Sequence, residues 1–249
     1  MASVKAIIQA RMGSTRLPQK VLMPLLGKPM LLRITQRLER CHRLDGIIVA
    51  TTDLPEDDVV AQLVERQPSL QLTRGSSRDV LGRYAQAAQE HSVDVVVRVT
   101  GDCPLIDPET VDRCISEFAR YEDECDYVSN TLKRTFPRGL DTEVFPKPIL
   151  LMAEQNARGG SEREHVTPYI WKEPLRFRIR QVKSATDWSH LRWTVDTMAD
   201  FELVARVYEE LGSDGAFDYP TICALFSRTP ELMEINRHID QKPFESKGC

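Results

Sequence analysis

The sequence predicts an α/β protein: a single domain over residues 1–249, built on a doubly wound, mostly parallel sheet with a small lid or dimerisation element. Two observations lead to this prediction. Short apolar runs rich in Val and Ile alternate with longer stretches of helical periodicity through the first half of the chain. These runs are apolar at nearly every position, which is typical of strands buried on both faces of a parallel sheet.

In the first half, strands are expected at residues 4–10, 46–52 and 93–100, and helices at residues 30–42, 56–66, 79–91 and 108–120. Two of these helices carry start signals. Pro55-Glu56-Asp57 places acid in a first turn, and Asp107-Pro108-Glu109 combines an N-cap, an N1 proline and first-turn acid. Ligands of such sheets bind beyond the carboxyl ends of the strands, so the loops after the strands are where chemistry is expected.

The second half is less regular and is expected to complete the sheet. Its predicted strands cover residues 126–130, 140–145 and 175–182, and its predicted helices cover residues 147–157, 162–171, 200–211 and 219–227. Residues 175–182 alternate Leu, Phe, Ile and Val with Arg and Gln, as a half-exposed strand does. A domain of this size does not easily cover such a strand, and an uncovered apolar strand invites pairing, so we expect a homodimer.

Composition excludes several classes of protein. A hydrophobic content of 41% with 28% charged residues is typical of a globular chain rather than a disordered or fibrous one. No apolar stretch approaches the ~18–20 residues that a membrane helix needs. The six cysteines show no CxxC or Cys/His metal spacing, which favours reduced thiols and a cytoplasmic protein; Cys103 is expected to be a small buried residue. The net charge of −4 argues against a protein that coats nucleic acid.

The first 38 residues nevertheless contain seven cations and no acid. Three of the cations, Arg11, Arg16 and Lys20, lie in the loop that follows the first strand, together with Gly13 and two hydroxyl residues. The spacing matches neither the dinucleotide fingerprint nor the P-loop. Arg and Lys in such a loop can bind several phosphate oxygens, and Gly13 lets backbone N–H groups approach an anion. An ordinary solvated basic loop is the alternative. Arg11 and Lys20, as charged residues on a loop, are expected to contribute little packing.

Two aspartates follow other predicted strands. Asp102 comes after a strand end and a glycine, and Asp196 follows a short strand that is expected to end at Val195. Mg²⁺ takes oxygen ligands and would neutralise both the carboxylates and a triphosphate that faces them, whereas without a cation the two carboxylates would repel each other. The alternatives are a turn residue for Asp102 and a helix cap for Asp196. Thr197 or Asp200 is expected to cap the following helix, and Asp107 is a cap rather than a ligand.

Five motifs, in this order, resemble those of the cytidylyltransferases that make CMP-activated acidic sugars: IIQARMGSTRLPQKVL, TGDCPLID, RGLDTEVF, SEREHVTPYI and WTVDT. The resemblance covers nearly the whole chain and is greatest to the spore-coat-polysaccharide group. It implies a nucleotide-diphospho-sugar transferase-like, Rossmann-type fold, in which residues 135–185 form an acceptor-binding and dimerisation insertion. One departure is Gln19, where the family usually has Gly, so a positive φ at this position would be strained.

The resemblance also implies an activity and a set of residues. CMP would pass from CTP to an acidic sugar of the nonulosonate or octulosonate type with release of pyrophosphate, and Mg²⁺ would be the cofactor. Catalysis would involve Arg11, Lys20, Asp102 and Asp196, of which Asp102 and Asp196 would hold the metal. The nucleotide would contact Ala10, Arg11, Met12, Gly13, Ser14, Thr15, Arg16, Lys20, Thr51, Arg74, Gly75, Ser76, Asp79, Thr100, Gly101 and Asp102. The acceptor would contact Arg138, Asp141, Glu143 and His165.

Several alternatives stay open at this point. Residues 74–78 could equally form a turn at the start of a helix, with Arg74 or Arg78 as surface charge. His165 could have a structural role, as a lone His on a helix often does. The acceptor could be a small phosphonate. A metal-dependent glycosyltransferase would share the sheet, but it uses an Asp-x-Asp motif where this chain has Asp102-Cys103-Pro104. A nucleic-acid binder could use the basic N-terminus, but the rest of the chain is acidic, which argues against this class. The expected partners are therefore CTP and a small acid, with no nucleic acid and no membrane.

Overall fold

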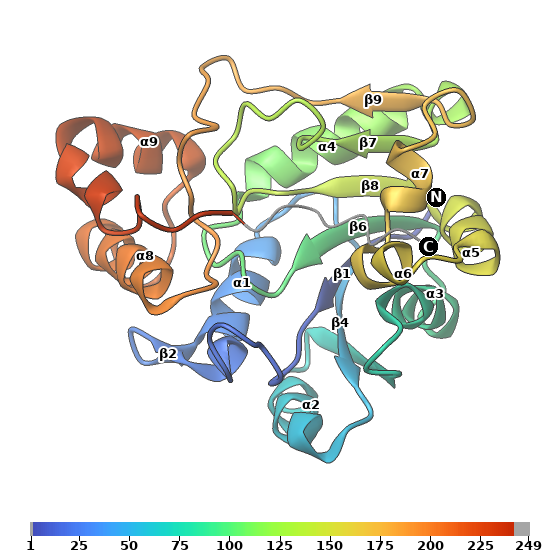
Figure 1. The fold of residues 1–249 in the computed structure, drawn as a ribbon, viewed down its shortest axis with the longest axis horizontal. Helices are drawn as coiled ribbons and strands as arrows, with labels where there is room; N and C mark the ends of the chain where they lie inside the picture. Colours follow the sequence, from blue (N-terminus) through green and yellow to red (C-terminus); the bar gives the residue numbers. More distant parts are fainter. Residues whose placement is uncertain (1, 242–249) are drawn as a thin grey trace.

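A computed structural model describes residues 2–241 and contains one seven-stranded sheet (Figure 1). Among the described strands of this sheet, β8 alone runs antiparallel to its neighbours, which confirms the mostly parallel sheet. The order across the sheet is β5 (Leu70–Gly75), β4 (Gly46–Thr52), β1 (Val4–Gln9), β6 (Val95–Thr100), β8 (Glu143–Pro146), β7 (Tyr127–Ser129) and β9 (Ile179–Gln181).

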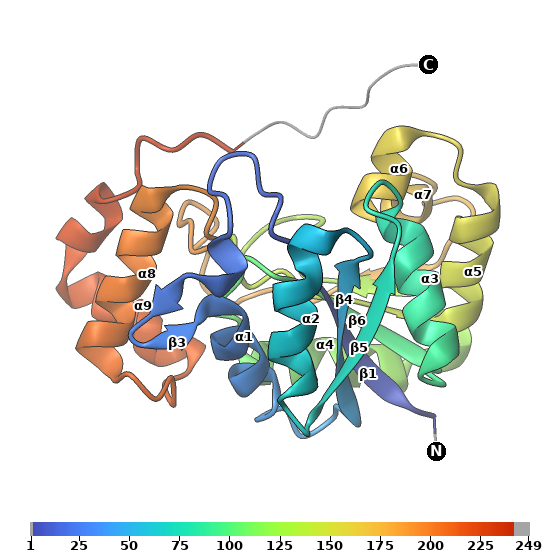
Figure 2. The same ribbon diagram turned by 90° about the horizontal axis from the view of Figure 1, so that it is seen from below.

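Helices cover both faces of the sheet (Figure 2). Both faces must be covered because the central strands are apolar on both. In β1, Ala6 and Ile8 point into one apolar core, while Ile7 points into the other. The first core is closed by α1 (Met30–Leu38), α2 (Asp58–Glu65), α4 (Pro108–Arg120), α8 (Met198–Leu211) and α9 (Tyr219–Arg228). The second is closed by α3 (Val80–Glu90), α5 (Lys147–Asn156) and α7 (Pro168–Trp171), with α6 (Gly160–His165) packed against α3.

Short elements complete the described chain. Strands β2 (Pro24–Leu25) and β3 (Lys28–Pro29) form a two-stranded antiparallel ribbon that contacts α1. Single turns of 3₁₀-helix occupy Lys20–Leu22, Pro55–Asp57, Glu122–Glu124 and Pro230–Glu234. The expected N-cap of α4 is confirmed, because the Asp107 carboxylate accepts the Thr110 N–H at 2.8 Å. Five cysteines are free and buried, Cys103 among them, and Cys249 lies outside the described residues.

Four details differ from the sequence-based expectations. Strand β5 was not predicted, because its Leu-Gln-Leu-Thr-Arg-Gly sequence belongs to a half-exposed edge strand rather than to an apolar run. The helix expected at 162–171 is divided into α6 and α7 at Val166, and the strand expected at 140–145 begins only at Glu143. Residues before Asp196 form no described strand; they are extended, with one isolated bridge between Arg192 and Arg138.

Residues 175–182 do not form the uncovered apolar strand from which a homodimer is expected. Within residues 175–182, only Ile179–Gln181 is a strand, and it joins the central sheet beside β7. Phe177 and Val182 are buried in the same chain, and Leu175 is the fully exposed apolar residue of the segment. The apolar alternation therefore reflects mainly intramolecular packing. Of the helices in the described part, none is both long and apolar enough to cross a membrane.

Candidate functional site: a crevice at the carboxyl ends of the central strands

Lys20 is the centre of a charged cluster beyond the ends of β1 and β6. Its Nζ lies 3.2 Å from Asp102 Oδ2, 3.0 Å from Asp196 Oδ1 and 2.7 Å from the carbonyl oxygen of Val195. The residue is only 8% exposed. The structure thus brings together Lys20 and the two aspartates from three distant segments, but it contradicts the expectation that this lysine contributes little packing.

The charges of this cluster support one another. Burial disfavours the ammonium form of Lys20, but the carboxylates of Asp102 and Asp196 outweigh burial and raise the pKa of the lysine above its usual value. Burial likewise disfavours ionised Asp196, yet Lys20, Arg192 and Arg16 outweigh it and lower the pKa of Asp196. The expectation that the two carboxylates repel each other in the protein without metal is therefore wrong. The Lys20 ammonium lies between them and screens their charges.

Asp196 is positioned by its own segment. Its Oδ2 accepts a hydrogen bond from Arg192 at 2.7 Å and forms an ion pair with Arg16 at 2.8 Å. Thr197, not Asp196, is the N-cap of α8: its hydroxyl accepts the Asp200 N–H, while the Asp200 carboxylate accepts the N–H groups of Asp196 and Thr197. The capping alternative for Asp196 is thereby excluded, and the Asp196 side chain is left to the crevice.

Asp102 is positioned by the end of β6. The Thr100 hydroxyl donates to Asp102 Oδ1 at 2.6 Å, and the carbonyl oxygen of Asp102 accepts the Val195 N–H at 2.8 Å. The second bond ties the two aspartate-bearing segments together. A Cβ on Gly101 would lie 2.6 Å from the carbonyl oxygen of Gln9, so glycine is required where β6 leaves the sheet beside β1.

The loop after β1 folds back on one peptide group. The carbonyl oxygen of Met12 accepts the N–H groups of Ser14 at 2.8 Å and Gln19 at 3.0 Å. Gln19 has φ of 62°, the left-handed conformation for which the usual glycine is suited. Arg11 is exposed, and its guanidinium donates to the Ser77 carbonyl oxygen at 3.4 Å. Of the loop residues, Gly13 and Thr15 are exposed and Ser14 is half-buried.

The predicted nucleotide residues on β4, β5 and α3 are engaged mainly with the protein itself. Arg74 donates to the Thr52 carbonyl oxygen at 3.0 Å and pairs with Asp58 at 2.7 Å. Asp79 is the N-cap of α3 and forms a two-pronged ion pair with Arg163 of α6. The Thr51 side chain is fully buried. Gly75 ends β5, and the Ser76 hydroxyl accepts the Arg78 N–H at 3.3 Å.

Arg138 and Asp141 lie next to the aspartate cluster. The backbone of Arg138 pairs with the extended segment before Asp196, through bonds to Leu191 at 3.1 Å and Trp193 at 2.7 Å. Gly139 makes this approach possible, because with φ of 105° it places the position of a Cβ only 2.6 Å from the Trp193 and Thr194 backbone. Asp141 is paired with Arg134 at 2.6 and 2.9 Å.

Glu143 and His165 lie on the α6–α7 side. Glu143 is buried and accepts hydrogen bonds from Arg98, Tyr127 and Thr167, the last at 2.6 Å. His165 ends α6, where partial burial lowers the pKa of its imidazole. Val166 then adopts φ 72° and ψ −55°, a strained γ-turn closed by the Thr167 N–H and the His165 carbonyl oxygen at 2.9 Å.

Comparison with known proteins shows which family of proteins has this crevice. A family model described as cytidylyltransferase matches residues 5–219. The spore coat polysaccharide biosynthesis protein SpsF of Bacillus subtilis is 31% identical over 238 residues, covering 93% of this chain and 97% of that protein. The chain belongs to the cytidylyltransferase family.

Two further comparisons agree with this family. The 3-deoxy-manno-octulosonate cytidylyltransferase of Chlorobium chlorochromatii is 37% identical over 189 residues, covering 74% of this chain and 69% of that protein. The structure of a cytidylyltransferase from Leptospira borgpetersenii matches with a TM-score of 0.91 and 31% identity, over 97% of this chain and 100% of that one. The chain is accordingly a CTP-dependent nucleotidyltransferase, and the predicted family, fold and enzyme class are confirmed.

The donor set of this cytidylyltransferase fits a divalent cation only together with substrate. Within residues 2–241, no three or more His, Cys, Asp or Glu side chains form a group that could hold a metal ion. Asp102 and Asp196, however, each direct one carboxylate oxygen to the same point, which the Lys20 ammonium shares. Two carboxylates completed by phosphate oxygens and water are a common way of holding Mg²⁺, so these residues fit that ion.

Two arginines that sequence reasoning left without a role form ion pairs with predicted site residues. Arg192 is buried and joins Asp196 to Asp200, at 2.7 and 2.9 Å. The sequence signal that could have identified Arg192 is a cation in an apolar segment, four residues before Asp196. Arg163 links the start of α3 to α6, and only the three-dimensional structure brings it to Asp79.

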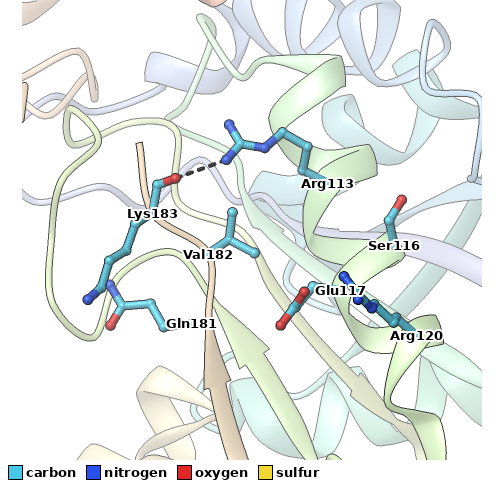
Figure 3. A pocket seen from close by; sticks show the side chains of 7 residues that line it. All are labelled: Arg113, Ser116, Glu117, Arg120, Gln181, Val182 and Lys183. Atoms are coloured by element: carbon cyan, nitrogen blue, oxygen red, sulfur yellow. Dashed lines mark hydrogen bonds between the residues drawn. The ribbon is translucent and has the colours of Figure 1, made fainter. Parts of the chain in front are cut away.

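A hollow of about 360 Å³ lies away from this crevice, between α4 and the segment that follows β9 (Figure 3). Three cations line it, and one of them, Arg113, donates to the carbonyl oxygen of another, Lys183, at 2.9 Å. Glu117 in its wall is paired with Arg180. None of the predicted site residues lines this hollow. The lining residues are Arg113, Ser116, Glu117, Arg120, Gln181, Val182 and Lys183.

Proposed function

We propose that this cytidylyltransferase transfers CMP from CTP to an acidic sugar of the nonulosonate or octulosonate class, with Mg²⁺ as cofactor and pyrophosphate as the second product. The observation that carries the proposal is the meeting of two loop cations, Arg16 and Lys20, with two aspartates at the carboxyl ends of the central strands. A third cation of the same loop, Arg11, is exposed. Cations bind a triphosphate, and carboxylates hold the metal ion that accompanies it.

The protein's own residues would act mainly by position and charge. Arg11 is exposed and has one long hydrogen bond, so its guanidinium can turn to a phosphate oxygen at little cost. Arg16 and Lys20 already have carboxylate partners, and each would exchange one of them for phosphate when CTP enters. The acceptor oxygen would attack the α-phosphorus in line with the leaving pyrophosphate, a reaction in which positioning and charge neutralisation contribute most of the catalysis.

Asp102 and Asp196 would hold Mg²⁺. The ion would supply positive charge to the phosphate oxygens as negative charge builds on the leaving pyrophosphate. Thr100 and Arg192 hold the two carboxylates in place through the bonds described above. The Val195 N–H, which donates to the carbonyl oxygen of Asp102 at 2.8 Å, ties the two aspartate-bearing segments together.

Arg138 is the best candidate for binding the acid group of the acceptor. It is half-buried beside the Asp196 segment, and its guanidinium makes no hydrogen bond or ion pair within residues 2–241. Burial and the neighbouring cations Arg134 and Arg192 lower the pKa of Arg138, which therefore gains from an anion. The curated relatives named for spore coat polysaccharide and for octulosonate favour a sugar acid, and by extension a cytoplasmic step of polysaccharide synthesis.

The proposal is tested by incubating the protein with CTP, Mg²⁺ and one acceptor at a time: a nonulosonate, an octulosonate, a neutral hexose and a small phosphonate. We expect pyrophosphate and a CMP-acceptor of matching mass with a sugar acid, and no product with the hexose. Arg138→Gln should raise KM for the acid acceptor far more than KM for CTP. A product formed only with the phosphonate would replace the acceptor class proposed here.

A further inference from the structure

Asp57 is a buried carboxylate for which the proposed mechanism has no use. It ends the 3₁₀ turn Pro55–Asp57 after β4, and its side chain is fully buried. No Lys, Arg or His within the described part of the chain forms a salt bridge with it. A buried carboxylate that lacks such a partner is costly to keep, unless hydrogen-bond donors compensate for lost water.

The donors come from outside its own helix. Asp57 is the residue that precedes α2, yet its side chain accepts no bond from that helix. Instead, Asp57 Oδ1 accepts the N–H of Met12 at 2.6 Å, and Oδ2 accepts the Thr52 hydroxyl. Thr52 Oγ1 in turn accepts the Leu54 N–H at 3.2 Å, which fixes the hydroxyl. The carboxylate is therefore aimed at the loop after β1.

The Met12 peptide is the point on which that loop folds. Its N–H is bound by Asp57, while its carbonyl oxygen accepts the N–H groups of Ser14 and Gln19. Arg11 precedes Met12 directly, and Lys20 follows Gln19 directly. Holding Met12 in one orientation thus sets where the loop begins and where it closes. Glu56 lies close to the same turn, since its Oε1 would be 3.1 Å from a Cβ on Gly13.

We propose that Asp57 is a positioning residue for triphosphate binding: it fixes the Met12 amide and thereby holds the cations of the β1 loop toward the crevice. The inference rests on the proposed function, because that function assigns the loop to the triphosphate. The Asp57–Met12 bond is charge-assisted and lies out of water, conditions under which a hydrogen bond is stronger and a lost one more costly.

The test compares Asp57→Asn with Asp107→Asn. Asp107 is a matched control, because it is equally buried and also accepts N–H groups of Thr110 and Tyr219, but it holds α4 and α9 together instead of the loop. Two quantities are measured on each full-length variant: hydrogen exchange of the backbone amides in residues 10–20, and kcat/KM with separate KM values for CTP and acceptor.

We expect Asp57→Asn to speed amide exchange in residues 10–20 and to lower kcat/KM for CTP roughly 10- to 100-fold, with the KM for the acceptor unchanged. Thr52→Val should give a smaller change in the same direction, since it removes the hydroxyl that orients the carboxylate. Asp107→Asn should speed exchange at the starts of α4 and α9 but not in residues 10–20, and it should leave the CTP constants as in the parent.

The inference is overturned if Asp57→Asn and Asp107→Asn give the same exchange in residues 10–20 and the same KM for CTP. It is also overturned if loop exchange rises while the CTP constants stay unchanged. Arg11→Ala, run alongside, separates the two proposals. Unchanged turnover in Arg11→Ala would count against assigning the loop to the triphosphate, whereas the exchange data on Asp57→Asn would still decide whether Asp57 anchors the loop.

Discussion

At the scale of single residues, Arg11 and Lys20 should respond differently to removal although both belong to one loop. Arg11→Ala removes an exposed side chain, so the free energy of unfolding should stay the same. The fall in kcat/KM should correspond to a loss of about 2–4 kcal/mol of transition-state stabilisation. Lys20→Ala should lower turnover as much, and it should also lower the free energy of unfolding by a few kcal/mol, because Asp102 and Asp196 lose their shared partner.

Urea unfolding and steady-state kinetics on both variants check this difference. Equal stabilities of the two variants would mean that the Lys20 ion pairs contribute nothing to the fold. A near-normal kcat/KM in either variant would remove that residue from the triphosphate site.

The two aspartates should act as a unit toward Mg²⁺. Asp102→Asn and Asp196→Asn should each lower kcat much more than CTP affinity, and the double variant should be little worse than the worse single one, since both serve one ion. The measurement is kcat against Mg²⁺ concentration. Additive losses, or a Mg²⁺ dependence equal to that of the parent in either variant, would show that this pair does not hold the metal.

Stability should again separate these two aspartates. Asp196→Asn weakens bonds to three cations, Lys20, Arg16 and Arg192, whereas Asp102→Asn affects one. We therefore expect Asp196→Asn to be the more destabilising change in urea unfolding, and Asp102→Asn to be the cleaner probe of catalysis.

At the scale of elements, the loop between β1 and the turn Lys20–Leu22 contains a strained residue. Gln19 has φ of 62°, and the left-handed conformation costs a residue with a Cβ about 1–2 kcal/mol. Gln19→Gly should therefore raise the free energy of unfolding by up to about 1 kcal/mol, after the greater freedom of unfolded glycine is subtracted. Gln19→Ala, which keeps the Cβ, is the control.

Thermal and urea unfolding of these two variants and the parent give the answer. If Gly and Ala at position 19 were equally stable, the positive φ would carry no strain. Gln19 is exposed, and within residues 2–241 its side chain forms no hydrogen bond, so kcat should remain close to that of the parent in both variants.

The elements also show what the sequence could predict. Strands β1, β4 and β6 and helix α4 were predictable, because local patterns alone define them: apolar runs buried on both faces, and a complete N-cap signal at Asp107. Strand β5 was not, since it lies at the edge of the sheet and five of its six residues are only partly buried. The division between α6 and α7 depends on the γ-turn at Val166, which tertiary contacts such as Thr167 to Glu143 hold against its strain.

The site was predictable as a set of residues but not as a geometry. Motifs identified Lys20, Asp102 and Asp196, and loops after parallel strands gave their common location. That Lys20 lies between the two carboxylates, and that Asp57 binds Met12, depends on segments 45 to 176 positions apart in the sequence. No local pattern carries that information.

At the scale of the whole molecule, we still expect a homodimer, although on narrower grounds than the sequence offered. Strand β9 is an edge of the sheet in the described chain, and Leu175 nearby is fully exposed. Sedimentation at micromolar concentration should give the mass of two chains, and Leu175→Lys should shift the equilibrium toward one. A monomeric mass for the parent protein would refute the dimer.

The central claim is that the fold holds the cationic loop after β1 and the two aspartates, Asp102 and Asp196, around one triphosphate-binding site. A ³¹P NMR record of a single reaction with CTP, Mg²⁺ and an octulosonate or nonulosonate tests that claim most directly. We predict that the CTP signals give way to equal amounts of pyrophosphate and a phosphodiester, and that Asp102→Asn slows both together. Inorganic phosphate in place of pyrophosphate, or pyrophosphate without a phosphodiester, would contradict the account.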